Sequence, residues 1–78
     1  MKESRKQAKA WIDGLTKSRF NAVVDELKLT PFQREIVMMR HVNGFDNSRI
    51  AIETMRCKEQ ISAELSKIYE RIATNFLQ

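Results

Sequence analysis

Residues 46–65, DNSRIAIETMRCKEQISAEL, decide how this chain folds. Asp46 is a preferred helix N-cap, so it predicts a short helix over residues 47–54. A brief break is expected over residues 55–57, and a longer helix is expected to begin near Lys58. The stretch therefore predicts a short helix, a tight turn and a long helix.

The apolar residues of this stretch have the spacing that two crossing helices require. A small side chain is needed where the first helix approaches the second, and Ala51 supplies it beside the larger Ile50. Ten residues after Ala51, Ile61 returns an apolar side chain to the same core, and Leu65 follows one turn later. We interpret the stretch as a helix-turn-helix motif with Ile50, Ala51, Ile61 and Leu65 as its core.

Outside this stretch, apolar residues also recur at helical spacing, and no segment shows sustained alternation. Thr30, Pro31 and Gln33 form the clearest helix start, because they fit an N-cap, a first helical position and a capping box. Gly44 fits the position just past the end of that helix. The expected core stripes are Ala8, Trp11, Ile12 and Leu15; Phe20, Val23, Val24 and Leu27; Phe32, Ile36 and Met39; and Ile61, Leu65, Ile68 and Ile72.

These patterns predict an all-α fold, a small bundle of about five helices in one domain over residues 1–78. Its first helix is expected to end at Gly14 and its second to cover residues 20–27. We divide the domain into a basic N-terminal helical segment, residues 1–19, and a core over residues 20–78.

The positive charge of the chain is concentrated at its start. The net charge is +4, and residues 20–78 are balanced, so the first 19 residues carry the whole excess. Basic segments of this kind commonly contact phosphates, but on charge alone we favour the other interpretation, a solvated helix face that aids solubility. The charged residues of the segment are Lys2, Arg5, Lys6, Lys9, Lys17 and Arg19 against Glu3 and Asp13.

Composition argues against several classes of protein. No apolar run approaches the roughly 20 residues that a membrane span needs, so no membrane contact is expected. The single cysteine, Cys57, excludes an intramolecular disulfide and points to the reducing cytoplasm. The chain has one histidine, His41, no glycine-rich phosphate loop and no clustered metal ligands. We therefore expect no enzyme activity, no metal and no cofactor.

Cys57 and His41 are expected to have structural roles only. A lone cysteine in a helical domain is usually a small, partly buried apolar residue, and we expect that of Cys57. His41 falls near the end of the third expected helix, with no obvious partner for catalysis or metal binding.

Several stretches of the sequence resemble two known families of helix-turn-helix domains. The stretch Leu29–Val37, LTPFQREIV, resembles the LTPRERE(V/I) opening of region four of bacterial sigma factors and of the LuxR/GerE group. Gly44 and the helix-turn-helix core residues fall at the spacings of both groups. LSKIYERI, residues 65–72, is similar to the LuxR-type LSNIYRKL stretch. The similarity covers about residues 20–72, and the helix expected over residues 20–27 favours the sigma-like group.

The turn departs from the pattern of these families. They usually have Leu-Gly-Ile/Val-Ser where this chain has Thr54-Met55-Arg56-Cys57. Met55 replaces a residue whose flexibility eases the turn. Cys57 replaces a good N-cap, a loss of typically about 1 kcal/mol.

The resemblance implies a DNA-binding surface. In such motifs the start of the second helix, the recognition helix, enters the major groove. Lysine can donate to guanine, glutamate can accept from cytosine, glutamine can pair with adenine, and alanine can touch the methyl group of thymine. The candidate base-contacting residues are Lys58, Glu59, Gln60, Ser62 and Ala63. The candidate phosphate-contacting residues are Arg34, Arg49, Arg56 and Lys67, for each of which an ordinary surface charge is the alternative.

Tyr69, Ile72 and Phe76 lie beyond the length of helix that the motif needs. We expect them to complete the core against Trp11 and Phe20. The alternative, suggested by the LuxR-like stretch, is a two-fold contact in a homodimer.

The leading hypothesis is a stand-alone, sequence-specific regulator of transcription from a bacterium or phage, with double-stranded DNA as its partner. One alternative is a mimic of sigma region four that binds RNA polymerase or a sigma or anti-sigma partner. A second is a small terminase-like subunit for DNA packaging.

Overall fold

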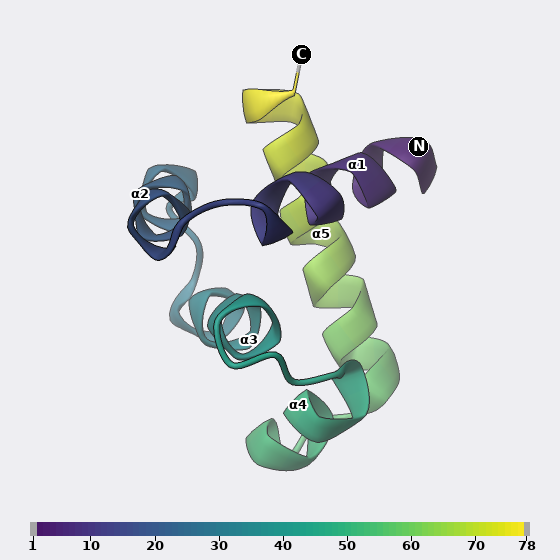
Figure 1. Cartoon of the computed structure of the whole chain (residues 1–78). Helices are drawn as coiled ribbons and strands as arrows, with labels where there is room; N and C mark the ends of the chain where they lie inside the picture. Colours follow the sequence, from purple (N-terminus) through teal and green to yellow (C-terminus); the bar gives the residue numbers. More distant parts are fainter. Residues whose placement is uncertain (1, 78) are drawn as a thin grey trace.

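A computed structural model describes residues 2–77 of the chain, with side chains from Arg5 to Leu77. The side chains of Lys2 and Glu3, two of the charged residues of the N-terminal segment, lie outside the described residues. Five helices account for nearly all of the described chain, and it contains no strand (Figure 1). The all-α prediction is confirmed. The helices are α1 Lys2–Asp13, α2 Lys17–Leu27, α3 Pro31–His41, α4 Asn47–Thr54 and α5 Lys58–Phe76.

Side-chain caps set where three of these helices begin. The side chain of Thr30 accepts a hydrogen bond from the Gln33 N–H at 3.2 Å, and the Gln33 side chain accepts one from the Thr30 N–H at 3.3 Å. This is the predicted capping box. The Asp46 carboxylate accepts from the Arg49 N–H at 2.8 Å and begins α4, as predicted.

The start of α2 differs from the prediction. The helix begins at Lys17, three residues before Phe20, because Thr16 caps it by accepting a hydrogen bond from the Arg19 N–H at 3.3 Å. The apolar stripe begins only at Phe20, so periodicity alone placed the helix start too late. A polar first turn carries no periodic signal.

Gly44 lies in the connection after α3, two residues past the C-cap Val42, whereas the prediction placed it just past the helix end. Its φ is +75°, in the left-handed region that glycine adopts without strain. A Cβ at this position would meet nothing within 4 Å, so the backbone conformation and not crowding favours glycine. The Phe45 N–H then donates to the Met39 carbonyl at 3.0 Å and closes the turn.

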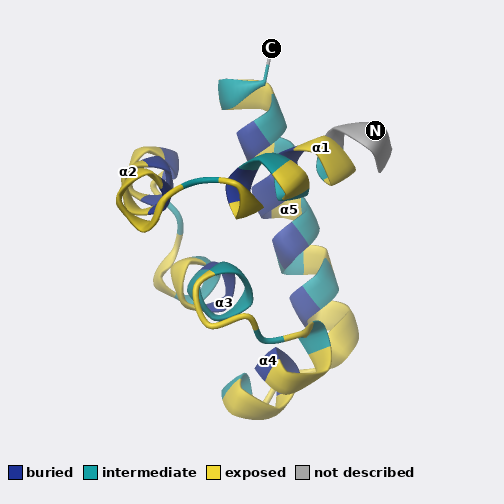
Figure 2. Ribbon diagram, in the orientation of Figure 1, coloured by how far each residue is buried: buried dark blue, intermediate teal, exposed yellow. Residues whose placement is uncertain are grey.

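The long helix α5 is the centre of the molecule (Figure 1). Helices α1, α3 and α4 all pack on it, and α2 is tied to it by Arg71, which donates to the Leu27 carbonyl. Figure 2 shows buried positions recurring along α5. The core residues are Ala8, Ile12, Phe20, Val23, Val24, Leu27, Ile36, Val37, Ile50, Ala51, Ile61, Leu65, Ile68, Tyr69 and Ile72.

The basic N-terminal segment is part of the folded core. Helix α1 crosses α5 and buries Ala8 and Ile12, while Trp11 stacks on Phe76 with ring centroids 5.4 Å apart. Arg5 forms an ion pair of 2.8 Å with a glutamate of α5, so at least one basic side chain of the segment is already engaged within the chain.

The predicted alternative of a two-fold contact through the end of α5 is wrong for Tyr69 and Ile72. These side chains are 8% and 0% exposed within a single chain, so they have no surface left for a second copy. Phe76 is half-buried and occupied by Trp11. Tyr69 and Ile72 belong to the core, and Phe76 packs against it through Trp11.

No described helix combines the length and the apolar character that crossing a bilayer requires.

We expect Ile61→Ala to lower the free energy of unfolding by about 2–5 kcal/mol, because Ile61 is fully buried where α4, α5 and the core meet. Ile52→Ala is the matched control. Ile52 is 73% exposed, so its truncation should change stability by less than about 0.5 kcal/mol. Urea denaturation followed by circular dichroism measures both values. Equal losses in the two variants would contradict the core assignment.

Candidate functional site

The first two turns of α5 present a polar surface. Lys58, Glu59, Gln60 and Ala63 are exposed, whereas Ile61 between them is fully buried. Because α-helical residues three and four apart lie on one face, Gln60 and Ala63 share a face, as do Glu59 and Ala63. We call these four exposed residues the α5 start. Four of the five candidate base-contacting residues therefore reach the surface together.

The fifth candidate, Ser62, is partly covered. Its hydroxyl oxygen accepts a hydrogen bond of 3.0 Å from Asn47 Nδ2, at the first residue of α4. Ser62 therefore links the beginnings of α4 and α5, and its surroundings differ from those of the α5 start.

The turn between α4 and α5 fixes the direction of the α5 start. Met55 has φ +59°, and the Arg56 N–H donates to the Ala51 carbonyl at 2.9 Å, a 6→1 bond typical of a Schellman motif. Ala51 itself is 8% exposed beneath this turn, as the helix crossing requires. The short connection between the two helices leaves little freedom for their relative orientation.

Cys57 corrects one prediction. It occupies the N-cap of α5 with its side chain exposed, not partly buried, and makes no capping hydrogen bond. The chain turns outward between α4 and α5, so a residue there faces solvent whatever its hydrophobicity.

The four candidate phosphate-contacting cations are spread over the molecule. Arg34 is exposed and forms an ion pair with a carboxylate of α2, and Lys67 pairs with Glu64 at 3.4 Å. Arg49 pairs with Glu53 at 3.0 Å and lies over an aromatic ring, with 4.4 Å from its Cζ to the centroid. Arg56 covers the ring of a phenylalanine of α3 at 4.7 Å. Arg49, Arg56 and Lys67 belong to the helix-turn-helix, whereas Arg34 lies on α3.

Sequence analysis missed a series of hydrogen bonds that joins three helices through the buried ring of His41. His41 of α3 bonds through Nδ1 to Asp13, at the end of α1, and through Nε2 to the Tyr69 hydroxyl of α5 at 2.8 Å. The His41 side chain is only 1% exposed. The sequence analysis considered partners of His41 only for catalysis or metal binding, and did not foresee these two hydrogen bonds. Each partner is 28 residues away, on a different helix, so no local pattern could reveal the contact.

We call these two linked hydrogen bonds the Asp13–His41–Tyr69 relay. Burial governs the protonation of its side chains. Desolvation lowers the pKa of His41 and outweighs the opposing hydrogen bond and charge of Asp13. Desolvation also raises the pKa of Tyr69 to about 12. A neutral imidazole then donates a hydrogen bond from Nδ1 to the Asp13 carboxylate and accepts one at Nε2 from the Tyr69 hydroxyl.

Within the described residues, no group of three His, Cys, Asp or Glu side chains is close enough to hold a metal ion. Comparison of the chain with protein-family models, curated proteins and solved structures finds no match. The α5 start and its surroundings are therefore interpreted from their own geometry and chemistry.

We expect Met55→Gly to raise the free energy of unfolding by up to about 1 kcal/mol, because a side chain in the left-handed region is strained. Ile52→Gly, in the exposed middle of α4, is the control and should lower it by about 0.5–1 kcal/mol. Thermal and urea unfolding provide the two values. Losses in both variants would show that the Met55 side chain stabilises the turn.

The lowered pKa of His41 predicts a pH-dependent stability. The unfolded state, in which histidine titrates near 6.5, binds protons more readily than the folded state. Stability should therefore be complete above that pH and fall as the pH drops below it. Asp13 opposes the shift, and Arg40 and Lys9 reinforce it.

Unfolding by urea at several pH values between about 5 and 7.5 tests this, since His41 is the single histidine of the chain. His41→Gln keeps polar contacts without a titrating group, so its stability should be lower but nearly independent of pH in this range. An unchanged pH slope in His41→Gln would exclude His41 as the source.

Proposed function

We propose that this chain binds double-stranded DNA in a sequence-specific way and regulates transcription, with the α5 start in the major groove. One observation carries the proposal. The small Ala51 and the apolar Ile61 are buried where α4 meets α5, and the first two turns of α5 expose Lys58, Glu59, Gln60 and Ala63.

The dimensions and chemistry of the α5 start suit a groove. The major groove of B-DNA admits a single α-helix. Lys58 supplies a donor for guanine, Glu59 an acceptor for cytosine, and Gln60 both a donor and an acceptor for adenine. Ala63, one turn later, offers a methyl group small enough to approach thymine.

The sequence resemblance supports the same function. The capping box at Thr30 belongs to the LTPFQREIV stretch that resembles sigma region four, and α2 precedes it where a sigma-like domain carries a helix. Lys58-Glu59 resembles the Arg-Glu pair that sigma region four uses to touch bases. A small regulator encoded by a bacterium or phage fits this resemblance.

Exposed cations supply the contacts to the DNA backbone in this proposal. Arg49 on α4 and Arg56 in the turn are exposed, as are Lys6, Lys17 and Arg19 of the N-terminal segment. Each neutralised phosphate releases counterions, so binding weakens as salt rises.

A second candidate function is binding of RNA polymerase or of a sigma or anti-sigma partner. It is favoured by the balanced charge of residues 20–78, because a DNA-binding surface is usually more basic. The exposed apolar side chains of Ile52 and Met55, 73% and 92% exposed, also suit a protein partner. A pull-down with purified polymerase, with and without DNA, separates this function from direct DNA binding.

We expect the chain to select a short DNA sequence from a random duplex pool, and its affinity for that duplex to fall steeply between about 50 and 200 mM salt. Lys58→Ala and Glu59→Ala should change the selected sequence, whereas Lys6→Ala should weaken all sequences alike. Fluorescence anisotropy with the selected and with scrambled duplexes measures these effects. Failure to bind at low salt, or equal effects from the three variants, would contradict the proposal.

A further inference from the structure

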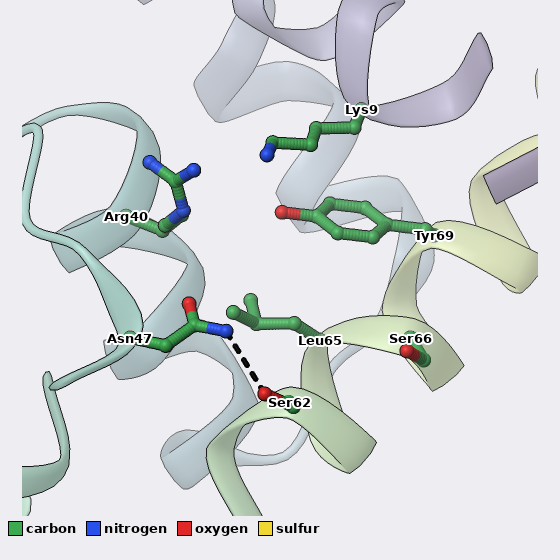
Figure 3. A pocket seen from close by; sticks show the side chains of 7 residues that line it. All are labelled: Lys9, Arg40, Asn47, Ser62, Leu65, Ser66 and Tyr69. Atoms are coloured by element: carbon green, nitrogen blue, oxygen red, sulfur yellow. Dashed lines mark hydrogen bonds between the residues drawn. The ribbon is translucent and has the colours of Figure 1, made fainter. Parts of the chain in front are cut away.

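A polar hollow of about 320 Å³ lies beside the relay, where four helices meet (Figure 3). Its volume is at the lower end of the range of ligand pockets, so it suits a small ligand or part of a larger one. We call it the α1–α5 hollow. It is lined by Lys9 of α1, Arg40 of α3, Asn47 of α4, and Ser62, Leu65, Ser66 and Tyr69 of α5.

The lining is rich in positive charge and in hydrogen-bond donors. The Lys9 amine, the Arg40 guanidinium and the Tyr69 hydroxyl point toward one another across the hollow (Figure 3). Ser62 and Ser66 add two further hydroxyls, and no carboxylate belongs to the lining. Such a set of groups attracts a negatively charged ligand with several acceptor oxygens.

The two cations have no anionic partner within the described part of the chain. Arg5, Arg34, Arg49 and Lys67 each form an ion pair, but neither Lys9 nor Arg40 does. Arg40 makes only a long contact of 3.5 Å from Nη1 to a backbone carbonyl. Desolvation lowers the pKa of His41 most, and the positive charges of Arg40 and Lys9 lower it further.

Asn47 supplies an independent observation. Its Oδ1 is buried without a hydrogen-bond partner among the described residues, although its Nδ2 donates to Ser62. An unpaired buried carbonyl oxygen is costly. The structure places Oδ1 on the side of the hollow and Nδ2 toward Ser62 (Figure 3). An amide rotated by 180° would instead accept from the Ser62 hydroxyl at Oδ1 and present its two Nδ2 protons to the hollow.

We propose that the α1–α5 hollow is a binding site for one phosphate group, held by Lys9 and Arg40, with the Asn47 amide and the Ser66 hydroxyl completing its coordination. The guanidinium of Arg40 can pair with two phosphate oxygens, and the Lys9 amine with a third.

Two sources can supply this phosphate. One is the DNA backbone, because the hydrogen bond between Ser62 and Asn47 joins the hollow to the first turns of α4 and α5, next to the α5 start. The other is a small phosphorylated compound. With either source, occupancy would hold α1, α3, α4 and α5 together.

The first experiment uses inorganic phosphate with the full chain. Phosphate, compared with chloride at equal ionic strength, should raise the melting temperature and shift the NMR signals of Lys9, Arg40 and Ser66 in a saturable way. Lys9→Gln and Arg40→Gln should each weaken phosphate binding roughly tenfold, since each removes a charge-assisted hydrogen bond. Lys9→Arg should retain binding, and Lys28→Gln, at an exposed lysine outside the hollow, is the control.

The second experiment distinguishes the two sources. If DNA supplies the phosphate, Lys9→Gln and Arg40→Gln lower the affinity for a duplex and flatten its salt dependence, whereas Lys28→Gln does not. If a small compound supplies it, DNA binding is unchanged in these variants while phosphate binding is lost.

The proposal is overturned if phosphate acts no differently from chloride and the Lys9 and Arg40 variants bind duplex like Lys28→Gln. Saturable phosphate binding without any DNA binding would contradict the proposed regulatory function and leave the phosphate site supported. Circular dichroism of each variant shows whether it is folded. If a variant that removes a charge does not fold, Lys9→Arg still tests the site, because it keeps the charge and should retain phosphate binding.

Discussion

The apolar side chains along one side of α5, its apolar seam, must be buried by the other helices. Which helix covers which part of the seam determines how the helices are arranged. Ile61, Leu65, Ile68 and Ile72 are all buried on one side of a 19-residue helix. Helix α4 covers the beginning of the seam, and α1 and α3 cover the remainder. Because the covering helices lie on one side, the opposite side of the first two turns stays exposed. The polar α5 start is thus a consequence of how the seam is buried.

The same constraint explains why a residue as small as alanine lies at position 51. Helix α4 has only eight residues, so it has few side chains with which to hold itself on α5. Ile50 is fully buried and Ala51 is 8% exposed beside it, which allows a close approach without loss of apolar contact. The left-handed Met55 then returns the chain at once into α5. A strained residue and an uncapped N-terminus at Cys57 accompany this short connection, so the turn contributes little stability of its own.

Local signals were sufficient to predict most of the fold. Thr30 with Gln33, Asp46 and the left-handed Gly44 act through contacts within a few residues, so the sequence reveals them. Where the signal was polar and weak, as at Thr16, the helix start was misplaced. For the candidate site, the burial of Ile61 predicts which of its neighbours are exposed. The partners of His41 and the convergence of Lys9 on Arg40 depend on how three helices pack, which no spacing along the chain encodes.

The relay and the α1–α5 hollow show how a small domain with limited apolar burial also uses polar contacts between its helices. A chain of this length buries only about 60% of the surface of its unfolded form, so each helix needs contacts beyond apolar packing. His41 satisfies both ring nitrogens by bonding to residues of α1 and α5. Its partner Tyr69 also lines the α1–α5 hollow, together with Lys9 and Arg40. The His41 side chain, which joins α3 to α1 and α5, thus lies close to two half-buried cations without an ion pair among the described residues. An anion placed there would relieve the repulsion between Lys9 and Arg40 and, through Tyr69 and His41, strengthen the contact that keeps α1 on α5.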